Sequence, residues 1–184
     1  MPTFILIPNG DSLQEWDSSG GGASSYTDVD NDNGDTEYAY SRTNNERMIV
    51  DMTTPLEAGI IPSDVDTIDS VTIKISAAYT HTSFNAGVTV QQVGTAEDLS
   101  SISNGSDTIA VASGGSYATY SGTAETTSDG SDAWVYGDLT GLQLRLTKFR
   151  SPRFGELRIS YLYAEVAYTA AEAADNATFF GANF

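Results

Sequence analysis

Residues 71–77 read Val71-Thr72-Ile73-Lys74-Ile75-Ser76-Ala77, and an apolar side chain stands at every second position. Successive side chains of a β-strand point to opposite faces, so this spacing makes one face of a strand dry and leaves the other in water. The same alternation recurs at residues 88–91 and at residues 142–147. Such patterns are typical of half-buried antiparallel strands.

Further strand candidates complete the pattern, and they lie at residues 4–7, 26–29, 47–52, 117–127 and 157–168. Clusters of Gly, Ser, Asp and Asn separate the strands and favour loops, at residues 18–25, 31–36, 100–116 and 126–132. No segment keeps a helical apolar period over several turns. About eight short strands with almost no helix predict an all-β fold, an antiparallel two-sheet sandwich of jelly-roll type. We assign residues 1–169 to this domain and residues 170–184 to a C-terminal tail or arm.

The last strand changes phase along its length. Leu157, Ile159 and Tyr161 define one face, whereas Leu162 and Ala164 continue on the other. An extra residue in one strand of an antiparallel pair shifts the alternation by one position. We therefore predict a β-bulge, or a strand centre buried on both faces, near residues 161–163.

The charge balance excludes several classes of partner. The 184 residues hold 8 Lys and Arg against 25 Asp and Glu, which gives a net charge of −17. Nucleic acids are bound through clustered cations, so we expect no nucleic-acid partner. No apolar stretch approaches the roughly 18 residues that span a bilayer, so we expect no membrane partner. Cysteine is absent, which excludes disulfides and thiolate metal sites.

Residues suited to catalysis are scarce. The single histidine, His81, stands at the expected end of a strand, where a loop position is the simplest interpretation. Paired carboxylates for glycoside hydrolysis require a cleft that the sequence does not define. We predict no catalytic residue and no cofactor, and we class the chain as a non-enzyme.

The segment from Asp28 to Glu37 has the appearance of a metal-binding loop. Asp28, Asp30 and Asp32 place carboxylates at alternate positions, as hard cations such as Ca²⁺ require. The glycine that follows comes one position later than in an EF-hand loop, and a solvated acidic turn explains the same composition. Asp28, Asp30 and Asp32 are therefore a weak calcium candidate.

Two other segments are candidate protein contacts. Arg145, Lys148, Arg150, Arg153 and Arg158 gather half or more of the basic residues into one stretch, which predicts either solvated strand ends or a basic strip that docks on an acidic partner. The tail holds Phe179, Phe180 and Phe184. These rings either cover their own sandwich or insert into a neighbouring subunit.

The aromatic residues allow two interpretations. Trp16, Trp134 and the ten Tyr residues can form a platform on which sugars stack, or they can fill the core of a sandwich. Most of the Tyr residues lie inside expected strands. We interpret them as core and cross-strand packing residues.

Several segments resemble structural proteins of tailed phages. They are Pro8-Asn9-Gly10-Asp11, Tyr26-Thr27-Asp28-Val29-Asp30, Ile68 to Lys74, Leu139 to Leu146 and Ser160 to Tyr168. In this order they resemble jelly-roll virion proteins, particularly capsid decoration (cement) proteins, over most of residues 8–168. The resemblance implies a place on the exterior of the phage head, a major capsid protein as partner, assembly as a trimer, and no catalytic residues.

Two functions follow as hypotheses. The first is a capsid decoration protein that stabilises the head. The alternative is a carbohydrate-binding or receptor-binding β-sandwich module, associated with a tail or fibre, that uses exposed Trp16 or Trp134.

Overall fold

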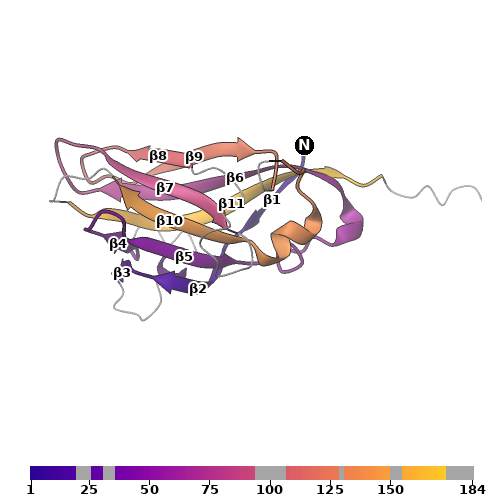
Figure 1. The fold of residues 1–184 in the computed structure, drawn as a ribbon, viewed down its shortest axis with the longest axis horizontal. Helices are drawn as coiled ribbons and strands as arrows, with labels where there is room; N and C mark the ends of the chain where they lie inside the picture. The colour runs from indigo at the N-terminus through magenta and orange to yellow at the C-terminus, as the bar shows by residue number, and fades with distance from the viewer. Residues whose placement is uncertain (20–25, 31–35, 94–106, 129–130, 150–154, 173–184) are drawn as a thin grey trace, which may run out of the picture.

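The computed structural model describes residues 1–19, 26–30, 36–93, 107–128, 131–149 and 155–172. In these ranges it contains eleven β-strands and three short 3-10 helices (Figure 1). No helix in them is long and apolar enough to cross a membrane.

The strands form two antiparallel sheets. Sheet A contains, in spatial order, β3 (Asp17–Ser18), β4 (Ala39–Ser41), β11 (Leu157–Ala170), β6 (Val65–Tyr79) and β9 (Ala118–Glu125), and β1 (Thr3–Leu6) also pairs with β11. Sheet B contains β2 (Pro8–Gln14), β5 (Arg47–Met52), β10 (Gln143–Phe149), β7 (Ala86–Val93) and β8 (Asp107–Val111).

The connections identify the sandwich as a jelly roll. Its eight principal strands divide into β4-β11-β6-β9 and β5-β10-β7-β8, and the chain changes sheet at every step from β4 to β11 except between β7 and β8. This arrangement is the eight-stranded double Greek key of jelly rolls. The predicted fold class is confirmed, with β1, β2 and β3 as additions.

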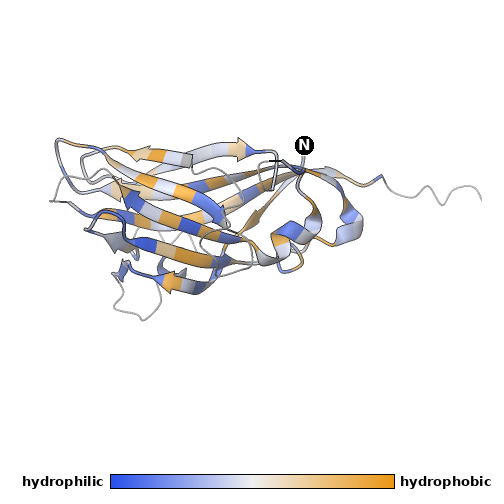
Figure 2. Cartoon of the chain, in the orientation of Figure 1, coloured by the Kyte–Doolittle hydropathy of each residue, from blue (hydrophilic) through white to orange (hydrophobic). Residues whose placement is uncertain are grey.

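The core lies between the sheets and follows from the alternation. Along β10 the residues are alternately half-buried and buried, so Leu144 and Leu146 lie inside and Arg145 and Thr147 outside. Along β6, Val71, Ile73 and Ile75 lie inside in the same way. Figure 2 shows the corresponding bands of apolar and polar residues along the strands.

Three local expectations were wrong. Residues 26–29 were expected to form a strand, but Tyr26–Asp28 is the 3-10 helix η1. Its first amide donates to Asp11 Oδ1 over 3.1 Å, and this side-chain contact favours a tight turn over strand pairing. The expected loop at 100–116 contains β8, and the strands β2, β3 and β4 were not expected. The strands β2, β3, β4 and β8 are short or polar, so their sequences show little alternation of apolar and polar residues.

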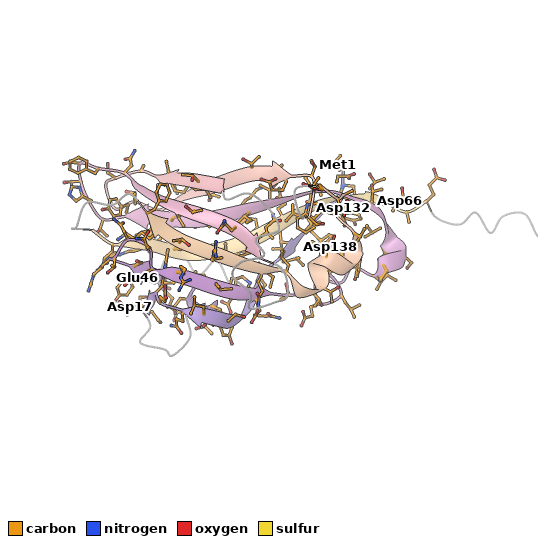
Figure 3. The ribbon with its side chains drawn as sticks, in the orientation of Figure 1. Met1, Asp17, Glu46, Asp66, Asp132 and Asp138 are labelled. Carbon is orange, nitrogen blue, oxygen red and sulfur yellow. The ribbon has the colours of Figure 1, made fainter. Side chains whose placement is uncertain are left out.

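The two remaining 3-10 helices and the C-terminal end of β11 lie at the same end of the sandwich. η2 (Pro62–Asp64) and η3 (Tyr136–Gly141) lie at the same end of the sandwich in Figure 1. Asp66, Asp132 and Asp138 are also at this end, opposite Asp17 and Glu46 (Figure 3). The amide of Ala171, just after β11, donates to the carbonyl of Asp64 over 3.0 Å. The C-terminal end of β11 therefore lies beside η2.

Replacing Trp134 with phenylalanine is expected to lower the free energy of unfolding by about 1–3 kcal/mol. The indole is 5 % exposed, and its Nε1–H donates to the carbonyl of Glu125 over 3.0 Å. Phenylalanine leaves that acceptor without its partner and a small cavity beside it. Urea unfolding of the W134F variant checks this, and an unchanged midpoint would mean that the hydrogen bond contributes nothing to stability.

Candidate functional site

The outer face of sheet A carries a group of five half-buried tyrosines. Tyr40, Tyr161 and Tyr163 point outward from β4 and β11, because the residues on either side of each are buried. Tyr38 is in ring contact with Tyr40, and Tyr117 is in ring contact with Tyr38. We call this surface the tyrosine face, and it consists of Tyr38, Tyr40, Tyr117, Tyr161 and Tyr163.

A β-bulge in β11 places two of these rings. The register of β11 against β6 shifts between Ile159 and Tyr161, which leaves Ser160 as the extra residue. Ser160 is buried, so the outward series Arg158, Tyr161, Tyr163 contains one three-residue step. Without the extra residue Tyr161 and Tyr163 would point into the core. The predicted bulge is confirmed, one position before the expected range.

The rings of the tyrosine face form two groups of contacting rings, Tyr161 with Tyr163 and Tyr38 with Tyr40 and Tyr117. The ring centroids of Tyr161 and Tyr163 are 4.9 Å apart with a tilt of 32°. Tyr38 lies 6.0 Å from Tyr40 and 6.4 Å from Tyr117, in edge-on and tilted contacts. Aromatic pairs at such separations stabilise one another beyond the area that they bury. The five side chains therefore form a preorganised apolar and hydroxyl-bearing surface.

Three cations lie over these rings. Arg158 Cζ is 4.7 Å from the centroid of Tyr38, and Arg42 Cζ is 5.2 Å from that of Tyr40. Lys74 Nζ, on β6, is 6.0 Å from the centroid of Tyr163. Cations at such distances are attracted by the negative face of an aromatic ring.

Two carboxylates pair with the three cations. Glu156 accepts hydrogen bonds from Arg42 and from Arg158, whose Nε lies 2.8 Å from Oε2. Burial would raise the pKa of Glu156, but the two guanidinium groups outweigh it and lower the pKa. Glu165 accepts from Lys74 Nζ over 2.7 Å, which raises the pKa of Lys74. The ion pairs fix the cations beside the rings, and because Arg42 and Arg158 share Glu156, these five groups keep one net positive charge.

This arrangement is suited to binding. Within the described ranges, no three His, Asp or Glu side chains gather as a metal site would need. His81 lies in the loop after β6, where its Nδ1 accepts from the amide of Ser83 over 3.0 Å, as the sequence predicted. The tyrosine face can offer rings for stacking and phenol, guanidinium and ammonium groups for hydrogen bonds.

The two indoles are buried and cannot serve as exposed binding residues. Trp16 is 2 % exposed and Trp134 is 5 % exposed. The Nε1–H of Trp16 donates to the carbonyl of Glu46 over 3.0 Å. The expected core role is confirmed for both indoles and for Tyr79, whereas the residues of the tyrosine face lie outside the core and pack against neighbouring rings. The bulge at Ser160 was the signal that could have revealed Tyr161 and Tyr163 as outward residues.

The basic stretch does not form one surface in the described residues. Arg145 lies on the outer face of sheet B, Arg158 on the outer face of sheet A, and Lys148 points into the core. Alternation and the change of sheet between β10 and β11 separate them. Arg150 and Arg153 lie outside the described residues, so their proposed contacts stay predictions.

The calcium candidate is described in part. Asp28 is 4 % exposed, and burial raises the pKa of its carboxyl group against the opposing effect of Ser18. Asp30 is half-buried, and Asp32 lies outside the described residues. Phe179, Phe180 and Phe184 also lie outside them. The calcium site and the contacts of the Phe residues therefore stay predictions.

Comparisons with known proteins give similarity to solved structures alone. No family model matches the chain, and no curated protein matches it. Among solved structures, the chain is similar to the CBM36-1 domain of a multidomain xylanase from the hindgut metagenome of Trinervitermes trinervoides, with 10 % sequence identity, 91 % of this chain and 98 % of that domain covered, and a TM-score of 0.47. At this identity the likeness concerns the β-sandwich arrangement alone.

Proposed function

We propose that this chain is a non-catalytic carbohydrate-binding module, and that its binding surface is the tyrosine face. The observation that carries the proposal is the placement of five half-buried tyrosines on the outer face of one sheet, in two groups of contacting rings. The apolar faces of sugar rings stack on aromatic side chains, and sugar hydroxyls require hydrogen-bond donors and acceptors beside them. Arg42, Arg158 and Lys74 provide donors over the same rings.

Substitution of Tyr161 and Tyr163 by alanine is expected to abolish glycan binding. Aromatic anchors at the centre of a binding surface each contribute more than about 1 kcal/mol, so each single variant should bind about tenfold more weakly and the double variant beyond detection. A glycan array followed by affinity electrophoresis on the best polysaccharide measures this.

The matched control is Tyr136→Ala. Tyr136 is a half-buried tyrosine of η3, away from the tyrosine face, and its hydroxyl donates to the carbonyl of Ile60 over 2.6 Å. Its binding should equal that of the unaltered protein. If no glycan is retained, or if the double variant binds as well as the control, the proposal is wrong.

A second candidate function is capsid decoration on a phage head. The resemblance to virion proteins favours it, and three of the segments that carry the resemblance lie in or overlap β6, β10 and β11, which are inner strands of the jelly roll. Tyrosine and arginine are also enriched at the centres of protein interfaces. In this case the partner is a major capsid protein, the protein is a trimer, and its place is the outer surface of the virion.

Binding to empty capsids separates the two candidates. A decoration protein should co-sediment with empty phage heads and sediment alone as a trimer. Deleting residues 170–184 then tests the tail, because undiminished capsid binding would remove it from the interface. A protein that sediments as a monomer, does not bind empty capsids and is retained by a polysaccharide supports the carbohydrate-binding proposal.

A further inference from the structure

Arg145 stands at the centre of the outer face of sheet B, on the opposite side of the sandwich from the tyrosine face. It belongs to β10, and its Cα partners are Ile49 on β5 and Gln91 on β7. Ile49 is 5 % exposed and Gln91 is 8 % exposed. Leu13 on β2 continues the row beyond Ile49. The guanidinium group therefore lies between an apolar flank, Ile49 and Leu13, and the buried amide of Gln91, where the local dielectric is lower than in water.

The charge pattern of the chain makes this residue unusual. Of the eight Lys and Arg residues, Arg150 and Arg153 lie outside the described ranges. Among the six that are described, Arg42, Arg47, Lys74 and Arg158 each form an ion pair with a glutamate. Lys148 is enclosed in the core, and Arg145 is the one outward-facing cation of the described part without a carboxylate partner. In a chain with about three acidic residues for every basic one, the absence of a carboxylate beside Arg145 requires a physical explanation.

The contacts of Arg145 leave hydrogen-bonding capacity unused. One terminal nitrogen donates to Gln91 Oε1, while the Nε atom is buried with no acceptor. Burial and then the positive charge of Arg47 lower the pKa of Arg145. Two acidic groups beside β5 are already engaged: Glu15 binds Arg47, and Asp51 Oδ1 accepts from Gln143 over 2.6 Å and from Ser12 over 2.8 Å. An anion bound beside the Arg145 guanidinium group would supply the negative charge that no carboxylate of the described residues provides.

We propose that Arg145 is the centre of a binding site for the carboxylate of a small anionic ligand, such as an acidic sugar, on the outer face of β5, β10 and β7. A planar guanidinium matches a planar carboxylate through paired hydrogen bonds, and the apolar flank strengthens the attraction. Arg47 adds positive potential from β5, with its own group still paired to Glu15. The site is independent of the tyrosine face and of the function proposed for it.

Titration with sodium glucuronate tests the proposal, with the Nε–Hε signal of Arg145 followed by NMR. Glucose is the neutral control, and sodium chloride at equal ionic strength is the screening control. The expected result is a saturable shift with a Kd near 1 mM, where glucose and chloride give none. Replacing Arg145 with methionine should weaken binding at least tenfold, measured by calorimetry, and lysine at this position should restore it in part, because lysine offers charge without the planar fork.

The matched control is Tyr136→Ala, which alters η3, outside both the tyrosine face and the outer face of β5, β10 and β7, and should leave glucuronate binding unchanged. Circular dichroism verifies that each variant is folded, and R145M is expected to fold because methionine keeps the alkyl packing without a buried charge. Equal binding of glucuronate by R145M and the unaltered protein would overturn the site. A shift of the Arg145 Nε–Hε signal with glucose or chloride that matches the shift with glucuronate would also overturn it, and tighter binding of sodium sulfate at Arg145 would overturn the assignment to a carboxylate.

Discussion

Replacing Lys148 with methionine is expected to raise the free energy of unfolding at pH 7 by about 1–3 kcal/mol. Lys148 follows Leu144 and Leu146 on the inward side of β10 and has no exposed surface. Its ammonium group has one hydrogen bond in the described part of the chain, a long one of 3.5 Å to the carbonyl of Gly155. Burial lowers its pKa to about 8, while the charges of Glu46 and Glu156 oppose the fall. Methionine fills a similar volume without a charge.

The pH dependence of stability follows from the sign of this shift. The folded-state pKa lies below the unfolded value of 10.5, so folding disfavours the charged amine. Below pH 8 both states are protonated, and the cost of burying the charge is present in full. As the pH rises from about 8 towards 10.5, the folded state loses its proton first, so the contribution of this group to stability rises. The unaltered protein should therefore gain stability relative to K148M between pH 7 and 9.5.

Chemical unfolding at pH 7, 8 and 9.5 measures both effects, with Lys74→Met as the matched control. Lys74 is a half-buried surface lysine paired with Glu165, so its loss should lower stability by about 0–1 kcal/mol at each pH. If K148M is less stable than the unaltered protein at pH 7, the ammonium group is better solvated than its burial indicates.

The principal strands could be predicted because their residues alternate. The expected strand at 47–52 coincides with β5, the alternating segments at 71–77 and 88–91 lie within β6 and β7, and the segment at 142–147 begins one residue before β10. One dry face per strand requires two sheets packed together, which fixes the fold class. The order of strands within the sheets did not follow from alternation, because it depends on pairings between residues far apart in the sequence.

The candidate site could be predicted only in part. Lysine is among the residues that are least often fully buried. The alternation along β10 places Lys148 on the inward side, but its residue type predicts an exposed position. The tyrosine face depends on Ser160, since one extra residue reverses which side chains of β11 point outward. The phase change in the sequence indicated a bulge, but only coordinates show on which side of it each ring lies. The Arg42 and Glu156 pair joins residues 114 positions apart, and no local pattern indicates it.

Gly155→Ala is expected to have the second large effect, a loss of about 2–5 kcal/mol of stability, from two separate causes. Gly155 has φ of 145°, where residues with a side chain are strained. A Cβ atom there would also lie 2.7 Å from the Tyr79 hydroxyl oxygen and 2.8 Å from two ring carbons. Tyr79 is fully buried, so its ring has no free space to move into.

Gly114→Ala separates the two causes. Gly114 has φ of 114°, but a Cβ atom there would meet nothing within 4 Å. This variant should lose about 1–3 kcal/mol, which is the backbone strain alone, and the difference between the two variants is the contact with Tyr79. Thermal and urea unfolding of both variants give that difference. Equal losses would mean that the Tyr79 ring moves aside for the added methyl group. The same movement would let water reach the Lys148 ammonium group, which the carbonyl of Gly155 binds. The stabilisation expected for K148M should then be smaller as well.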